Sequence, residues 1–162
     1  MTEQPVVHNT FTIERKYTAS PSRVFAAFAN QSAKRRWFAD GKGTEVLEFM
    51  MDFRVGGREY TRFRFQGGSE GAPPKGTEIR NDTTYQDIVP DRRIVFAYTM
   101  TIGDKRISAS LATVELRQSG KDTELIFTEQ GAFFEGADSP QMREGGWRDL
   151  LTKLDDELRK SA

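Results

Sequence analysis

Hydrophobic and polar residues alternate along most of the chain. The segment FTIERKY, residues 11–17, places Phe11, Ile13 and Tyr17 on one side and mostly polar residues on the other. Residues 94–102 repeat this alternation, with large apolar side chains at every second position. A period of two is typical of a β-strand that buries one face. From residue 44 to about residue 130, the pattern predicts six strands joined mostly by short turns, which favours an antiparallel sheet.

Three segments show the spacing of a helix instead. Residues 20–28, SPSRVFAAF, begin with a serine suited to an N-cap and a proline suited to the first turn. Residues 30–38, NQSAKRRWF, predict a second short helix, which the glycines of the following DGKG end. A third helix, about 30 Å long, is predicted over residues 141–160. Its apolar stripe consists of Trp147, Leu150, Leu151, Leu154 and Leu158.

The order of these elements predicts an α+β fold. One strand, two short helices, six strands and one long helix follow each other without an internal repeat. The length of 162 residues suits one domain, so we predict a single domain over residues 1–162, with a short flexible N-terminal segment over residues 1–8. The terminal helix is about as long as the strands, so it can lie along them. The predicted fold is a curved antiparallel sheet of about seven strands wrapped around the C-terminal helix.

Composition and charge argue against several classes of function. Lys plus Arg and Asp plus Glu both number 24, so the chain lacks the basic excess of most nucleic-acid-binding proteins. It has no cysteine and one histidine, which leaves no basis for thiolate chemistry or a zinc site. No apolar stretch is long enough for a membrane span, and the N-terminal sequence does not resemble a signal peptide. We therefore expect a cytoplasmic protein without a metal or cofactor and without a nucleic-acid partner.

Six fragments of the sequence resemble a known superfamily when they are taken together. They are SPSRVFAAF with the later WF, DFRVGGREY, YQDIVPDRRIVFAYTM, ISASLATVEL, TELIFTEQGAF and GWRDLLTKL. They cover nearly the whole chain from Phe11 to Leu158, and they resemble the START/Bet v 1-like (SRPBCC) superfamily and, within it, the activator of Hsp90 ATPase homologue 1-like family. The resemblance implies a helix-grip fold with a cavity between sheet and helix. Members of the superfamily carry lipids, sterols, hormones or polyketides, and a few are enzymes.

The aromatic residues of the strands are the main candidates for the lining of such a cavity. The chain has twelve Phe, four Tyr and two Trp, many of them at alternating strand positions. They either fill a closed core or line a ligand site, which is mostly apolar with a few polar groups. Small residues at positions 108–110, 112 and 113 favour open space. The candidate ligand-binding residues are Trp37, Phe49, Met51, Phe63, Tyr85, Phe96, Tyr98, Leu111, Phe127, Glu129, Trp147 and Leu151.

Three charged residues lie at inward-facing positions of apolar strands. By alternation, Arg15, Asp87 and Glu129 share a strand face with aromatic residues. Arg15 and Glu129 either pair with each other, reach solvent, or orient a ligand. Our first hypothesis is binding of a small apolar or amphipathic molecule. The second is an enzyme of the polyketide cyclase or hydrolase type, with Glu129, Asp87 or a tyrosine as its acid or base.

Two further expectations concern partners and the start of the long helix. The family name suggests a third hypothesis, an Hsp90-type chaperone partner. The activator proper has an additional N-terminal domain that binds the chaperone, whereas the first strand here is expected near His8, so this partner is doubtful. An exposed edge strand allows a homodimer. Gly145 and Gly146 indicate close approach of the helix backbone to the sheet rather than a hinge.

Overall fold

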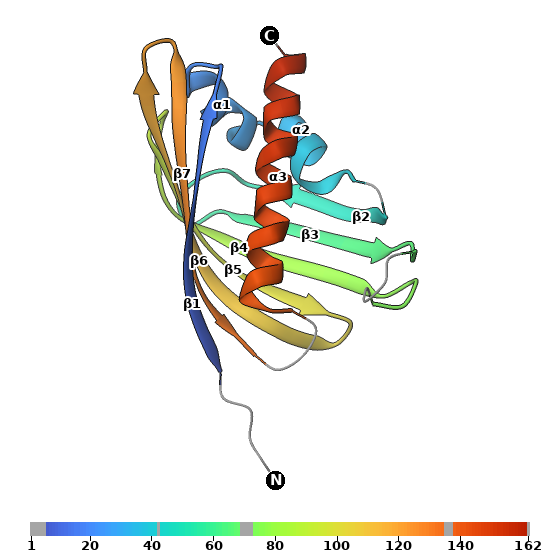
Figure 1. Cartoon of the computed structure of the whole chain (residues 1–162). Coiled ribbons are helices and arrows are strands. Elements are labelled where there is room, and N and C mark those ends of the chain that lie inside the picture. The colour runs from blue at the N-terminus through green and yellow to red at the C-terminus, as the bar shows by residue number, and fades with distance from the viewer. Residues whose placement is uncertain (1–5, 42, 69–72, 135–137, 162) are drawn as a thin grey trace.

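Seven antiparallel strands form one curved sheet, and the long C-terminal helix lies across its concave face (Figure 1). The computed structural model describes residues 6–41, 43–68, 73–134 and 138–161. The strand order is β1-β7-β6-β5-β4-β3-β2, and every neighbouring pair is antiparallel. The strands are β1 (Val7–Tyr17), β2 (Thr44–Met51), β3 (Arg58–Phe65), β4 (Glu78–Val89), β5 (Arg93–Ile102), β6 (Lys105–Ser119) and β7 (Asp122–Phe133).

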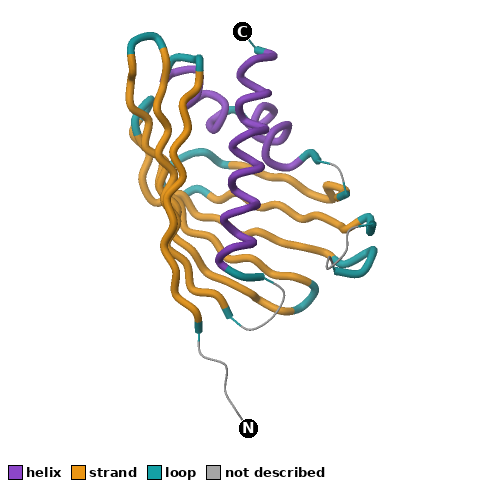
Figure 2. Tube along the Cα trace, in the orientation of Figure 1, coloured by secondary structure: helices purple, strands orange, loops and turns teal. Residues whose placement is uncertain are grey.

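The helices connect the two edges of the sheet and cover one face. α1 (Pro21–Ala29), α2 (Gln31–Lys34) and the π-helix η1 (Arg35–Ala39) carry the chain from β1 to β2, which are the two edge strands. α3 (Pro140–Lys160) follows β7 and passes in front of the sheet, as Figure 2 shows. This arrangement confirms the predicted α+β helix-grip fold, with a curved seven-stranded sheet around a C-terminal helix.

Burial along the strands follows the alternation of the sequence. In β5 the side chains of Ile94, Phe96 and Tyr98 are buried, and the residues between them are only partly covered. Two of the hairpin turns contain glycines with positive φ, Gly103 at 64° and Gly120 at 63°. Glycine adopts such angles readily because it has no Cβ. Local sequence thus determines both the face that turns inward and the points where the chain reverses.

Serine caps fix the starts of α1 and α3. The Ser20 hydroxyl accepts a hydrogen bond from the backbone N–H of Arg23 at 3.3 Å. The Ser139 hydroxyl accepts one from the backbone N–H of Met142 at 3.2 Å. Each cap satisfies one of the N–H groups that have no partner within the helix.

The second short helix differs from its prediction. The sequence predicts one helix over residues 30–38, and the structure divides this segment into α2 and η1. In η1 the Asp40 backbone N–H reaches back five residues to the Arg35 carbonyl at 2.8 Å, which is the hydrogen bond of a π-helix. The Trp37 indole Nε1 donates a hydrogen bond to the Ala27 carbonyl at 2.9 Å. η1 is thereby held against α1.

The two halves of α3 lie on different surroundings. The C-terminal half rests on a closed core, in which Leu151 and Leu154 are fully buried. The Tyr17 hydroxyl donates a hydrogen bond to the Leu151 carbonyl at 2.8 Å and ties this half to β1. Nearer the N-terminal end, the rings of Trp147 and Phe127 lie 4.3 Å apart between centroids. Between Met142 and Lys153, the helix also borders a pocket.

Two expectations fall partly on residues outside the described ranges. Val7 and His8, which the sequence places in the N-terminal segment, pair in β1 with Phe133 and Ala132, whereas residues 1–5 lie outside the described residues. The segment 67–76 joins β3 to β4 and is predicted from its glycines and prolines to be an exposed hairpin tip. Residues 69–72 of that segment also lie outside the described residues.

Candidate functional site: a pocket under the C-terminal helix

A pocket of about 900 Å³ lies between the N-terminal half of α3 and strands β3, β4 and β5. This volume is within the range of small-molecule sites in proteins. Met142, Gly146 and Leu150 form the helix side of the pocket, and the opposite side belongs to the sheet. Its apolar lining consists of Phe38, Ala39, Phe63, Phe65, Pro73, Pro74, Ile79, Met100, Ile102, Met142, Trp147 and Leu150.

Part of the predicted ligand-binding set lies at this pocket. Phe63, Tyr98 and Trp147 line it directly. Tyr85 and Phe96, together with Tyr98 and Trp147, line a small inner cavity of about 20 Å³. The alternation of the strands therefore brings these five residues to one region, although they come from three strands and a helix.

The other apolar members of the set lie elsewhere on the inner face. Trp37, Phe127 and Leu151 are buried in the closed core. Met51 packs against that core, and Phe49 is half-buried on the edge strand β2. None of these five residues lines the pocket. Their positions fit a packing role.

Leu111 lies on the outer face of the sheet, and its place in the predicted set is corrected. In β6 the side chains of Ser108, Ser110 and Ala112 point inward, so Leu111 points outward and is 37% exposed. The small residues of this strand also do not leave open space as predicted. Ser108 and Ser110 instead form hydrogen bonds with Arg143 of α3.

Gly145 and Gly146 do not provide the close helix–sheet contact that the sequence indicates. A Cβ added to either residue would meet no other part of the molecule within 4 Å. Both glycines are exposed to solvent, but Gly146 lines the pocket and Gly145 does not. The missing side chain at Gly146 therefore keeps space open beneath α3.

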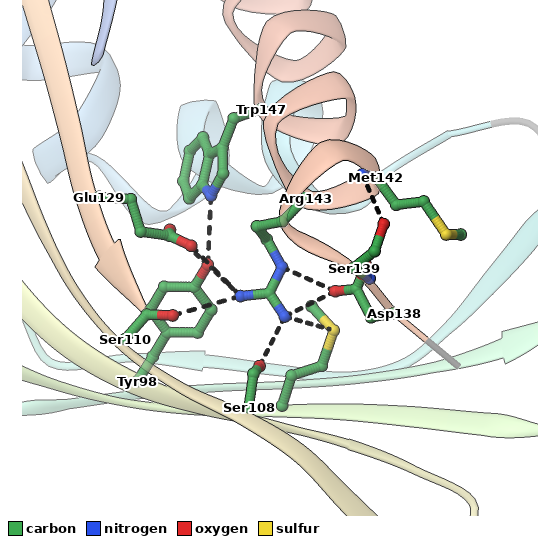
Figure 3. A network of polar contacts seen from close by, with 10 residues as sticks. Tyr98, Ser108, Ser110, Glu129, Asp138, Ser139, Met142, Arg143 and Trp147 are labelled. Atoms are coloured by element: carbon green, nitrogen blue, oxygen red, sulfur yellow. Dashed lines mark hydrogen bonds and ion pairs between the residues drawn. The ribbon is translucent and has the colours of Figure 1, made fainter. Parts of the chain in front are cut away.

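A network around Arg143, in the first turn of α3, forms the polar wall of the pocket (Figure 3). The guanidinium donates hydrogen bonds to Asp138 Oδ2 at 2.8 and 3.0 Å, to Ser108 Oγ at 2.6 Å and to Tyr98 Oη at 2.9 Å. It also forms an ion pair with Glu129 at 3.3 Å. We call Arg143, Asp138, Ser108, Tyr98 and Glu129 the arginine cluster. Arg143 is buried, yet several oxygen atoms satisfy its charge.

The Tyr98 hydroxyl is the centre of this cluster. It donates a hydrogen bond to Glu129 Oε1 at 2.6 Å, and it accepts hydrogen bonds from Arg143 and from Trp147 Nε1. Burial raises the pKa of Tyr98, and the nearby Glu129 carboxylate raises it further. Burial also raises the pKa of Glu129, although the charge of Arg143 opposes this effect. Tyr98 therefore keeps its proton at neutral pH.

Arg143, and not Arg15, is the basic partner of Glu129. Arg15 donates a hydrogen bond to the Arg148 carbonyl of α3 at 3.1 Å instead. One signal in the sequence could have identified Arg143. It lies four residues before Trp147, and residues four apart share a helix face, so it continues the apolar stripe toward the start of the helix.

Asp87, the other acidic candidate, lies away from the pocket. A β-bulge interrupts the register between Tyr85 and Asp87, so simple alternation does not hold there. The Asp87 carboxylate pairs with Arg93 at 2.7 Å, and its side chain is 44% exposed. It fits a surface ion pair better than a catalytic group.

A second buried ion pair lies at the inner cavity. Lys34 Nζ of α2 donates a hydrogen bond to Glu59 Oε1 of β3 at 3.0 Å, and the Tyr85 hydroxyl donates one to the same oxygen at 2.5 Å. We call these three residues the lysine cluster. The ammonium lies 4.7 Å from the centroid of the Phe38 ring and within 6 Å of three further aromatic rings. Aromatic faces therefore surround the charge where oxygen atoms do not.

The described part of the chain offers neither a metal site nor a membrane-spanning helix. There, no group of three His, Asp or Glu side chains lies close enough together to hold a metal ion. Over the same residues, no helix combines the length and the apolar character needed to cross a membrane.

Comparison with known proteins identifies the family. The family model described as activator of Hsp90 ATPase homolog 1-like protein matches residues 18–159. The chain belongs to this family. The match extends from the end of β1 to the last turn of α3, so it includes every strand of the pocket wall. A search of the curated proteins finds no match.

Solved structures share the fold of this family member over nearly its whole length. The Mll3558 protein from Rhizobium loti is 54% identical, with a TM-score of 0.83 over 95% of this chain and 99% of that chain. A protein from Rhizobium leguminosarum is 36% identical, with a TM-score of 0.85 over 96% of this chain and 97% of that chain. Protein CV1439 from Chromobacterium violaceum is 25% identical, with a TM-score of 0.71 over 93% and 96%.

Proposed function

We propose that the protein binds a small apolar or amphipathic molecule in the pocket under α3. The observation that carries this proposal is a space of about 900 Å³ whose lining is mostly apolar. Burying apolar ligand surface there would release water from both partners, which is the main driving force for such binding. Family membership supports the proposal, because the helix-grip fold supplies the covering helix and the curved sheet.

The distribution of charge favours an amphipathic ligand. Asp149 and Lys153 line the pocket from α3 and are exposed to solvent. Phe63, Phe65 and Ile79 lie on the sheet side. An elongated molecule with an apolar body would place that body against the sheet and keep a polar end near the exposed charges.

The contacts of the acidic residues favour binding over catalysis. Glu129 is 1% exposed and does not line the pocket, because Tyr98 and Arg143 lie on its pocket side. Tyr98 does line the pocket, but its raised pKa makes it a poor base at neutral pH. The enzyme hypothesis therefore has less support than the binding hypothesis.

Two neighbouring glycines provide a test of the proposed function. Both positions are exposed, but Gly146→Phe adds a large side chain where the residue lines the pocket, whereas Gly145→Phe adds the same side chain outside it. The probe is N-phenyl-1-naphthylamine, a neutral apolar dye whose fluorescence increases in apolar surroundings. We expect Gly146→Phe to weaken dye binding about tenfold or more, and Gly145→Phe to bind like the unmodified protein.

Circular dichroism would verify that both variants fold. Equal dye affinity for the two variants would show that the dye binds elsewhere. An absence of dye binding, with no small molecule released from the purified protein in native mass spectrometry, would count against the proposed function.

A further inference from the structure

We propose that Asn81 is the polar recognition residue of the pocket, and that it selects a neutral apolar ligand bearing a hydroxyl group. This inference rests on the proposed function and adds the chemical class of the ligand. Asn81 lies on β4 and lines both the large pocket and the inner cavity of about 20 Å³. Its side chain is therefore located where the two spaces meet.

The Asn81 amide oxygen is buried without a hydrogen-bond partner among the described residues. The residue is 8% exposed, and its Oδ1 has no hydrogen-bond partner. A buried polar group in this state is unfavourable, so native proteins nearly always satisfy it with protein, water or ligand. The vacant capacity of Asn81 therefore points to a partner from outside the chain.

The buried charged and phenolic groups on this side of the pocket are already engaged. Tyr98 donates to Glu129 and accepts from both Arg143 and Trp147. Arg143 already faces two carboxylates, those of Glu129 and Asp138. Lys34, which lines the inner cavity beside Asn81, is paired with Glu59. A carboxylate or phosphate placed at Asn81 would therefore meet cations that are already paired with negative charge.

A hydroxyl is the group that matches this site. An Asn amide offers both a donor and an acceptor, and a hydroxyl can accept from the first and donate to the second. The inner cavity next to Asn81 has about 20 Å³, which is enough for one water molecule or a group of that size. The apolar body of the ligand would then occupy the large pocket, with this hydroxyl at the inner end and any further polar group at the other end, near Asp149 and Lys153.

Thr61 provides a matched control on the neighbouring strand. Its hydroxyl is also buried without a hydrogen-bond partner, and Thr61 pairs with Asn81 in the register of β3 and β4. Thr61 lines neither the large pocket nor the inner cavity. Thr61→Val therefore removes an unpartnered polar group from the same layer without changing the surface that a ligand would contact.

The test compares two probes of almost the same shape, 4-phenylphenol and 4-methylbiphenyl, which differ in one hydroxyl. Affinities are measured by displacement of N-phenyl-1-naphthylamine from the unmodified protein, Asn81→Leu and Thr61→Val. We expect the unmodified protein to prefer the phenol about tenfold. Asn81→Leu should lose this preference and still bind the methyl compound, whereas Thr61→Val should retain it. If Asn81→Leu does not fold, Asn81→Ala serves the same purpose.

The outcomes separate this inference from the proposed function. Equal affinities for the two probes in the unmodified protein would overturn the role of Asn81 and leave the pocket intact, as expected if a water molecule occupies the inner cavity. A preference that persists in Asn81→Leu would also overturn it. Failure of the dye and both probes to bind would contradict the proposed function and remove the basis of this inference as well.

Discussion

The arginine cluster and the lysine cluster each contain a buried cation, and they compensate its charge in different ways. Each buries a base, a glutamate and a tyrosine, and in each the tyrosine donates a short hydrogen bond to the glutamate. The distance is 2.6 Å from Tyr98 to Glu129 and 2.5 Å from Tyr85 to Glu59. Both clusters face the inner side of the sheet, one at the wall of the pocket and one at its inner cavity.

The difference between them lies in how the cation is compensated. Arg143 donates to oxygen atoms of carboxylates and hydroxyls through all three of its nitrogen atoms. Lys34 has Glu59 as its oxygen partner and otherwise faces aromatic rings. A planar guanidinium suits many oxygen ligands, whereas a compact ammonium can rest among ring faces. We therefore expect the loss of one member of the arginine cluster to lower the free energy of unfolding more than the loss of its counterpart in the lysine cluster.

The largest expected difference in stability between the two clusters comes from replacing the cation of each one. Arg143→Met leaves the buried Glu129 and the largely buried Asp138 without the cation that they share, so we expect a loss of about 4 kcal/mol in the free energy of unfolding. Lys34→Met leaves Glu59 with its Tyr85 hydrogen bond and keeps an apolar side chain among the rings, so the loss should be about 2 kcal/mol. Urea denaturation at pH 7 measures both.

Arg148→Met is the control for the first comparison. Arg148 lies on the same helix, but it is exposed and pairs with Glu144 at 2.9 Å, so its loss should cost less than about 1 kcal/mol. A Lys34→Met variant as unstable as Arg143→Met would show that the number of oxygen partners does not set the difference.

Removal of each tyrosine hydroxyl should also destabilise the arginine cluster more than the lysine cluster, but by a smaller amount. Tyr98→Phe removes three hydrogen bonds, including one that Arg143 donates, and should lower the free energy of unfolding by about 2 kcal/mol. Tyr85→Phe removes one hydrogen bond and should cost about 1 kcal/mol. Thermal and urea unfolding would measure both, with the partly exposed Tyr60→Phe as a control. Equal losses at Tyr98 and Tyr85 would contradict the central position of Tyr98.

The smallest expected effect is the change of stability with pH that results from ionisation of Glu129. Burial raises the folded-state pKa of Glu129 above its unfolded value of about 4.3. A raised pKa stabilises the fold fully below the unfolded pKa, and this contribution is lost as pH rises through the folded pKa. The unmodified protein should therefore lose stability relative to Glu129→Gln as pH increases from about 4 toward neutrality.

Glu78, on the surface, is a control whose contribution to stability should change with pH in the opposite direction. Its hydrogen bond with Arg62 lowers its pKa, so its contribution is present above the unfolded pKa and is lost as pH falls. Urea denaturation across the pH range would compare Glu129→Gln with Glu78→Gln. Slopes of the same sign for both variants would contradict the assignment for Glu129.

The fold could be predicted because its signals are local. Alternation identified the strands, and Ser20 and the stripe from Trp147 to Leu158 identified helices, all within short windows of sequence. In two places a prediction differed because of a local irregularity that periodicity does not encode, whereas Leu111 was misplaced on a strand whose alternation is regular. The π-helix η1 and the bulge beside Asp87 are the two examples.

The polar part of the site could be predicted less well because its partners are distant in the sequence. Ser108, which accepts from Arg143, lies 35 residues before it, and only the folded sheet brings the two together. A charged residue near the start of a helix is usually exposed, so Arg143 resembles its exposed neighbours. Glu59 and Asn81 do share a strand face with Phe63 and Tyr85, and that alternation was a usable signal.

The positions of the two tryptophans have a spectroscopic consequence. Trp147 lines the pocket and donates its indole N–H to Tyr98, whereas Trp37 is held in the closed core with its N–H on the Ala27 carbonyl. A molecule entering the pocket changes the surroundings of one indole and leaves those of the other unchanged. The unlabelled protein therefore combines an emission signal for occupancy with an internal reference.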